Sequence, residues 1–198
     1  GKGQYVLYST ADLAPSMNLL REGTCELEAW IPFEKELSVM VAGNGETYTT
    51  FPVVENIHRN NILHETIAPA RVAPEVAEEA ARIAKQIAQA LDLRGCLAIE
   101  MFLTKAGGIY VNELAPRPHN SGHYTIEACN LSQFDAHIRG ICGWPLPKVK
   151  LLNEAVMVNI LGEHLEETYD LIELKPNWQF HYYGNKEAKT GRKMGHIT

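Results

Sequence analysis

Two β-hairpin patterns with an amphipathic helix between them limit this chain to a mixed α+β fold. The first pattern joins residues 34–42 to residues 46–54 through Gly43-Asn44-Gly45, a composition typical of a tight hairpin turn. Over residues 74–91 apolar side chains recur every three or four positions, and Pro74 suits the first turn of a helix. Because the apolar side of such a helix must be covered, we expect it to pack on the antiparallel sheet that the hairpins form.

The second hairpin pattern brings two acidic residues together. It runs over residues 96–103 and 109–114, and its four-residue loop pairs position i with position 213 − i, which sets Glu100 opposite Glu113. Two facing carboxylates in apolar surroundings repel each other and are costly to desolvate. A magnesium ion, which proteins hold with one or two carboxylates plus nucleotide phosphates, would relieve both costs. The alternative is a bulge that turns one glutamate to solvent, where it pairs with a cation elsewhere.

The remaining elements are predicted from local patterns. Residues 1–8 read as a glycine turn that runs directly into a strand, which suggests a chain truncated at its N-terminus. Residues 124–141 predict one helix, ended by Gly143 and the prolines that follow it. A strand is expected at 155–161, and the aromatic and polar alternation of 178–198 predicts further β-structure.

Composition excludes several classes of protein. With 24 acidic against 18 basic residues the net charge is −6, so bulk binding of nucleic acid is not expected. The sequence has no apolar stretch long enough for a membrane span and no signal-peptide pattern at its start. Its cysteines, at positions 25, 96, 129 and 142, match neither a zinc motif nor a dense disulfide framework. Reduced thiols and a cytoplasmic location are the expectation.

Three polar segments are candidates for ligand binding. The loop after the second hairpin is stiffened by Pro116 and Pro118 and carries Arg117, His119, Asn120 and His123, which favours recognition of an anion or polar ligand. A helical zinc site at the two histidines is unsupported, because prolines flank the arginine. The opening residues Gly1, Lys2, Gly3 and Gln4 could cradle phosphate or form an ordinary turn. The tail contains Lys186, Arg192 and Lys193, and this group is consistent with either a phosphate site or a solvated basic turn.

Several motifs together resemble one enzyme family. They are Glu28-Ala-Trp-Ile-Pro-Phe-Glu-Lys-Glu36, Asn56-Ile-His58, Glu100, NELAPRPHNSGHYT from Asn112, Ser132-Gln-Phe134 and GRKMGH from Gly191. The chain is similar over nearly its whole length to the N5-carboxyaminoimidazole ribonucleotide synthetases of the ATP-grasp superfamily. The resemblance implies an ATP-grasp core with an antiparallel sheet and packed helices, followed by a small C-terminal β-rich domain.

The resemblance also implies a carbon–nitrogen ligase reaction and roles for particular residues. Such enzymes use ATP and Mg²⁺ to phosphorylate bicarbonate, and the carboxyphosphate carboxylates 5-aminoimidazole ribonucleotide. By position, the residues that resemble the adenine hinge are Glu28, Ala29, Trp30 and Ile31. Glu36 resembles the ribose ligand, and His58 resembles a further nucleotide contact. The metal and ATP site would be formed by Glu100, Asn112 and Glu113. Arg117, His119 and Asn120 would line the bicarbonate and imidazole site, and Lys186, Arg192 and Lys193 the ribonucleotide phosphate site.

The family pattern is not complete in this chain. Asn185 stands where many members carry a lysine, so either Asn185 or Lys186 supplies that phosphate contact. The expected organisation is a remnant of the ATP-grasp lid at 1–27, a nucleotide- and metal-binding subdomain at 28–144 and a small C-terminal domain at 145–198. A chain lacking the N-terminal domain is expected to be inactive alone, and the full-length enzyme to be a homodimer. Two alternatives stay open: a nucleotide-binding module without activity, and an ATP-grasp ligase with another substrate.

Overall fold

The computed structural model describes residues 3–198, which form two units divided between Pro32 and Phe33. The first unit holds short helical turns, η1 (Thr10–Asp12), α1 (Leu13–Ser16) and η2 (Leu19–Arg21), and then extended chain. Gly3 has a φ of +75°, as a glycine turn requires. The strand predicted directly after it does not form, because the described residues of this unit include no strand that could pair with it.

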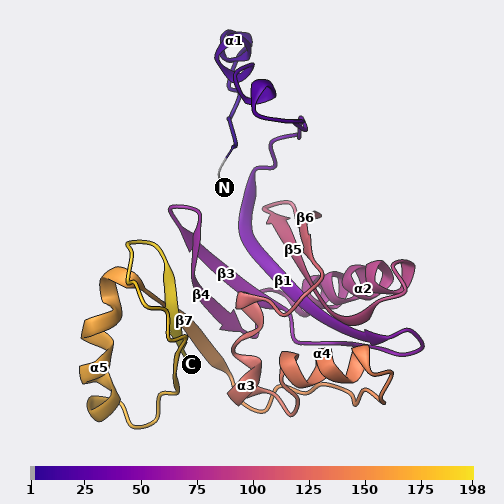
Figure 1. Ribbon diagram of the computed structural model, residues 1–198. Helices are drawn as coiled ribbons and strands as arrows, with labels where there is room; N and C mark the ends of the chain where they lie inside the picture. The colour runs from indigo at the N-terminus through magenta and orange to yellow at the C-terminus, as the bar shows by residue number, and fades with distance from the viewer. Residues whose placement is uncertain (1–2) are drawn as a thin grey trace. The chain divides into compact units, whose positions relative to one another are not determined.

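The second unit is built on one sheet of nine antiparallel strands (Figure 1). Their order across the sheet is β6-β5-β1-β3-β4-β7-β9-β8, with the short β2 paired to the far end of β1. The strands are β1 (Phe33–Asn44), β2 (Tyr48–Thr50), β3 (Val54–Arg59), β4 (Ile62–Ala68), β5 (Arg94–Thr104), β6 (Ile109–Ala115), β7 (Ala155–Leu161), β8 (Phe180–Tyr182) and β9 (Lys193–Ile197). The predicted α+β class with antiparallel pairing is therefore confirmed, and the C-terminal strands extend the same sheet.

Helices connect and cover these strands. They are α2 (Pro74–Ala90), α3 (Thr125–Ala128), α4 (Gln133–Ile141) and α5 (Leu165–Leu174), with the short turns η3 (Asn120–Gly122) and η4 (Gly162–His164). The helix α2 forms where the apolar periodicity predicts it, with Pro74 in its first turn. None of the helices in residues 3–198 is both long enough and apolar enough to cross a membrane.

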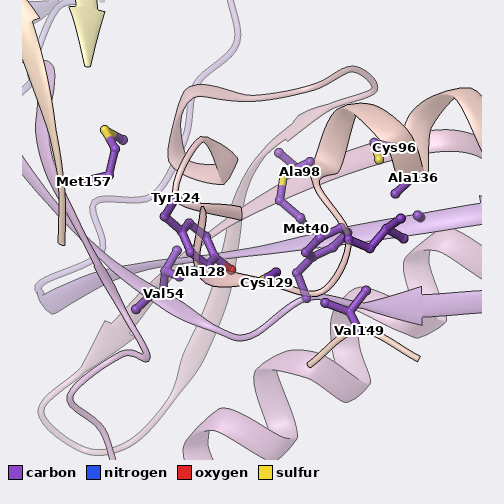
Figure 2. Packing of buried hydrophobic residues seen from close by; sticks show 14 of the residues in the cluster. Met40, Val54, Cys96, Ala98, Tyr124, Ala128, Cys129, Ala136, Val149 and Met157 are labelled. Atoms are coloured by element: carbon purple, nitrogen blue, oxygen red, sulfur yellow. The ribbon is translucent and has the colours of Figure 1, made fainter. Parts of the chain in front are cut away.

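The central strand β1 is buried on both faces, and its side chains alternate between two cores. Leu37, Val39 and Val41 pack with small residues of α2 in one core. Met40 and Ala42 belong to the other core, together with residues of β5, α3 and α4. Figure 2 shows Met40 in this second core, with Tyr124 and Ala98 nearby. Met40 and Ala42 of β1 therefore lie on the face that α3 and α4 cover.

Three local predictions need correction. The strand expected over 46–54 is reduced to β2, and the chain then turns away to start β3 and β4, a hairpin that sequence reasoning missed. The single helix expected over 124–141 is broken at residues 129–132, where Cys129 is extended and Ser132 caps α4. The helix α5 was not predicted at all. It lies between His164 and Lys175, and its weak apolar stripe gave little signal.

The second hairpin keeps the predicted glutamate pair by a different route. Glu100 is paired with Glu113, and Ala98 with Ala115, which follows 213 − i. Nearer the loop the pairs sum to 212, as in Met101 with Val111. A bulge at Asn112 restores the register that brings the two carboxylates together. The bulge of the alternative interpretation is therefore present and produces the pairing, and Glu113 is exposed as that interpretation expected.

Candidate functional site

The polar face of the sheet begins where the second core ends. Ser38 of β1 is paired with Glu100 of β5, and Glu36 is paired with Asn56 of β3. Directly paired residues of antiparallel strands project to the same face, so these four side chains and that of Glu113 share the face that carries Met40 and Ala98 farther along. One end of this face is apolar core, and the other presents three carboxylates.

Glu100 lies at the centre of this acidic group. Its side chain is 18% exposed, and burial raises its pKa, with Glu113 and Glu36 adding to the rise. His58 and Lys193 act against that rise. A partly desolvated carboxylate beside two others is a poor place for negative charge unless a cation joins it.

The donor set fits magnesium bound together with phosphate. In residues 3–198 no group of three or more His, Cys, Asp or Glu side chains could hold a metal ion alone. The Glu100 and Glu113 pair would supply two oxygen ligands, and magnesium takes the rest of its shell from water and substrate phosphates. The site therefore suits a metal that arrives with a nucleotide.

His119 is fixed beside Glu100 by contacts on both its backbone and its ring. Its Nε2 lies 3.5 Å from Glu100 Oε1, and its Nδ1 lies 2.9 Å from Ser121 Oγ. The amide of buried Gln133 accepts from the His119 backbone N–H and donates to its carbonyl, both at 2.8 Å. Burial lowers the pKa of His119 to about 4, assisted by Arg117 and Lys193. The ring is thus neutral near pH 7.

Asn120, the third predicted catalytic residue, is tied to the C-terminal strands. Its side-chain amide forms a reciprocal pair with that of Asn159 on β7, at 2.8 and 2.5 Å. Asn159 also donates to the carbonyl of Leu63 on β4 at 2.9 Å. The loop after β6 is therefore anchored to the sheet through two amides, and Asn120 has an anchoring contact besides any role toward a ligand.

Two of the predicted cations differ strongly in exposure. Lys193 at the start of β9 is partly buried, and burial lowers its pKa while the nearby Glu100 raises it. Arg192 is exposed and donates to Asn185 Oδ1 at 3.3 Å, and Asn185 donates to the Lys193 carbonyl at 3.2 Å. Asn185 therefore shapes the turn that carries both cations, whereas Lys186 is exposed.

The predicted nucleotide contacts fall in both units. In the second unit, Glu36 Oε2 lies 2.9 Å from Nδ1 of His58, without hydrogen-bond geometry. In the first unit, the hinge residues Glu28, Ala29 and Trp30 are exposed extended chain, and Ile31 is half-buried. Gly3 and Gln4 are also exposed there, whereas Gly1 and Lys2 lie outside the described residues.

Three stacked histidines that the sequence did not reveal pack beside the loop after β6. The His196 ring stacks on His123 at 4.6 Å and on His181 at 4.5 Å between ring centroids. Tyr183 Oη lies 2.8 Å from His196 Nδ1. Burial lowers the pKa of His196 to about 3 and that of His123 to about 4. The alternation of the tail was the available signal, since it places 181 and 196 on paired strands.

Comparison with known proteins decides the family. The ATP-grasp domain family matches residues 1–134, and the C-terminal domain family of phosphoribosylaminoimidazole carboxylase matches residues 155–198. The chain belongs to the ATP-grasp family.

Its relatives carry one consistent name. An N5-carboxyaminoimidazole ribonucleotide synthase of Bacillus subtilis is 51% identical over 100% of this chain and 52% of its own length. The crystal structure of an ADP complex of such a synthetase matches with a TM-score of 0.94 and 53% identity, over 100% of this chain and 52% of that one. The Aspergillus clavatus enzyme in complex with ADP and 5-aminoimidazole ribonucleotide matches with a TM-score of 0.81 and 39% identity, over 85% of this chain and 47% of that one. This ATP-grasp chain spans about half the length of these relatives.

Proposed function

We propose that this chain forms the metal- and substrate-binding part of an ATP-dependent carbon–nitrogen ligase that carboxylates 5-aminoimidazole ribonucleotide with bicarbonate. One observation carries the proposal. His119 of the loop after β6 lies 3.5 Å from Glu100 of β5, and the charge of Lys193 on β9 acts on the pKa of both. Phosphoryl transfer to an anionic acceptor requires a metal ligand, a hydrogen-bond donor and a positive charge, and these three residues can supply them.

In this reaction the chain's residues bind, orient and neutralise charge. Glu100 and Glu113 would hold Mg²⁺, which supplies charge neutralisation for phosphoryl transfer from ATP. Glu36 and His58 would contact the nucleotide, with Glu28–Ile31 as its adenine hinge. These roles follow from the family resemblance, and the polar face described above supports them.

The part of the site that binds bicarbonate and the ribonucleotide would lie beside Glu100, next to His119 and Arg117. Neutral His119 can donate a hydrogen bond to an anionic oxygen, and exposed Arg117 adds positive charge nearby. Arg192 and Lys193, with Lys186 or Asn185, would hold the ribonucleotide phosphate. The name of the Bacillus subtilis relative and the ribonucleotide bound in the Aspergillus clavatus relative favour this substrate over another amine.

The test is ADP release by a full-length enzyme that includes this chain. Release is expected to require both 5-aminoimidazole ribonucleotide and bicarbonate. Glu113→Gln should abolish most turnover at saturating magnesium, while the stability of the fold changes by less than about 1 kcal/mol, because an exposed edge carboxylate is removed. Glu79→Gln, on the exposed face of α2, is the matched control.

Turnover that does not depend on the ribonucleotide, or an unaffected Glu113→Gln enzyme, would refute the proposal. A substrate panel of other amines and acids identifies a different ligase if one of them replaces the ribonucleotide. A homodimeric full-length enzyme, a cytoplasmic location and domain limits at 27/28 and 144/145 remain predictions of the same proposal.

A further inference from the structure

Four buried polar side chains link the middle of the sheet to the ring of His119. Thr66 Oγ1 lies 3.0 Å from Asn56 Oδ1, and Asn56 Nδ2 lies 3.1 Å from Ser38 Oγ. Ser38 Oγ lies 2.9 Å from Ser121 Oγ, which lies 2.9 Å from His119 Nδ1. The four belong to β4, β3, β1 and η3, and none is more than 5% exposed.

Such a chain is costly unless every member is bonded. Each link here is within hydrogen-bond distance, so the members satisfy one another. Hydroxyls can donate or accept, and an amide can face either way. Taken alone, the chain could therefore run in either direction, with the last hydroxyl donating to His119 Nδ1 or accepting from it.

The backbone at Ser121 favours one of the two directions. Its N–H lies 3.4 Å from His119 Nδ1 and can only donate. A hydrogen on Nδ1 would oppose that N–H, so this contact favours Nδ1 as an acceptor. In that direction the Ser121 hydroxyl donates to Nδ1, the Ser38 hydroxyl to Ser121, and the Asn56 amide to Ser38. The Asn56 carbonyl oxygen then accepts from Thr66.

We propose that this buried chain holds His119 in the Nε2–H tautomer and directs that N–H toward Glu100, which makes Ser121, Ser38 and Asn56 positioning residues. His119 Nε2 lies 3.5 Å from Glu100 Oε1. With Nδ1 facing two donors and Nε2 carrying a hydrogen, the neutral ring has no free acceptor. His119 therefore donates a hydrogen bond to an anionic oxygen and does not remove a proton, a role that rests on the proposed function.

Nitrogen NMR of this chain tests the tautomer directly. Long-range proton–nitrogen spectra of the ¹⁵N-labelled protein at pH 8 separate Nδ1–H from Nε2–H imidazoles, and His119→Gln identifies the His119 signals among the 8 histidines. We expect His119 to be Nε2–H, with its Nδ1 resonance displaced as a strong acceptor. A predominant Nδ1–H form, or equal amounts of the two, would overturn the proposal.

Reversing the chain tests its control of the ring. In Asn56→Asp both side-chain oxygens accept, so Thr66 and Ser38 must both donate to the carboxylate. The Ser121 hydroxyl then donates to Ser38 and leaves its oxygen to accept from His119, which favours Nδ1–H. Asn44→Asp is the control, because Asn44 is also buried but caps the turn at the far end of β1.

We expect an Nδ1–H signal to appear in Asn56→Asp and not in Asn44→Asp. A His119 spectrum in Asn56→Asp identical to that of the unsubstituted chain would show that the buried chain does not control the ring. If Asn56→Asp does not fold, Ser121→Ala decides the matter, because losing the bond at 2.9 Å must move the Nδ1 resonance. An unmoved resonance would overturn the proposal.

These outcomes are separable from the fate of the proposed function. The tautomer is read without substrate or turnover, so a full-length enzyme with no carboxylating activity would leave the Nε2–H assignment standing. An active enzyme whose His119 is Nδ1–H would instead refute the positioning role alone.

Discussion

Acid is expected to unfold this protein through the histidine stack, with His196 as the most affected ring. His196 is 2% exposed and lies between His123 and His181, with Tyr183 on its Nδ1. Burial lowers its pKa from 6.5 to about 3, and the two neighbouring histidines add to the shift. Glu127 is bonded to the outer ring, His181, at 2.6 Å. A proton on His196 would thus be held in a buried site beside His123, whose pKa is also lowered by burial.

The sign and size of the effect follow from linkage. Because the unfolded chain binds the proton more readily than the folded one, stability is full above pH 6.5 and is lost as the pH falls toward 3. At pH 5 the unfolded ring is almost fully protonated and the folded ring is not, which amounts to a loss of about 2 kcal/mol from His196. His123 loses stability in the same direction, whereas the raised pKa of Glu100 acts oppositely.

Urea unfolding of the chain at pH 8 and pH 5 measures this loss. His196→Gln should lose about 2 kcal/mol less than the unsubstituted chain between the two pH values, whatever its stability at pH 8. His164→Gln, at an exposed position next to α5, is the control and should behave as the unsubstituted chain does. An equal pH-dependent loss in the unsubstituted chain and His196→Gln would refute the reasoning.

Three further changes test packing, capping and substrate binding. Gly140→Ala places a methyl group 2.4 Å from the carbonyl oxygen of Gly43 and 2.6 Å from the Gly95 nitrogen. It should lower the free energy of unfolding in urea by about 3 kcal/mol, and a loss below about 0.5 kcal/mol would contradict this packing. Ser132→Ala removes the hydroxyl that accepts a hydrogen bond from a backbone N–H in the first turn of α4. It should lower the free energy of unfolding by about 1 kcal/mol in the same assay, and an unchanged value would contradict the capping role. Arg192→Ala in a full-length enzyme should raise the KM for the ribonucleotide several-fold and leave that for ATP nearly unchanged; equal effects on both would place the arginine elsewhere.

Sequence patterns were sufficient where a single element determines its own structure. The α2 stripe depends on local spacing and is present, whereas the predicted Glu100–Glu113 pair forms only because a bulge restores its register. The bulge at Asn112 was not predictable from loop length, because it depends on how β6 aligns with β5 beyond the turn. The break at Cys129 also escaped detection, since the side chains on either side of it suit a helix.

The supporting residues of the site could not be predicted from local patterns. Gln133, Ser38 and His196 are separated by long stretches of sequence, and each is placed by strand pairing and helix packing. Buried Gln133 clamps the His119 backbone from the first turn of α4, a contact that exists only because the helix restarts there. Motifs revealed which side chains carry chemistry, and tertiary contacts determine which of them meet.

The central claim is that Glu100 and Glu113 hold a divalent ion together with nucleotide phosphates. Manganese can replace magnesium in such oxygen-ligand sites, and it broadens NMR signals of nuclei close to it. Titrating this chain with manganese and ADP should broaden the backbone signals of Glu100 and Glu113 more than manganese alone does, and a Glu100→Gln, Glu113→Gln double variant should lose the effect. Broadening that is centred elsewhere, or that persists in the double variant, would contradict the account.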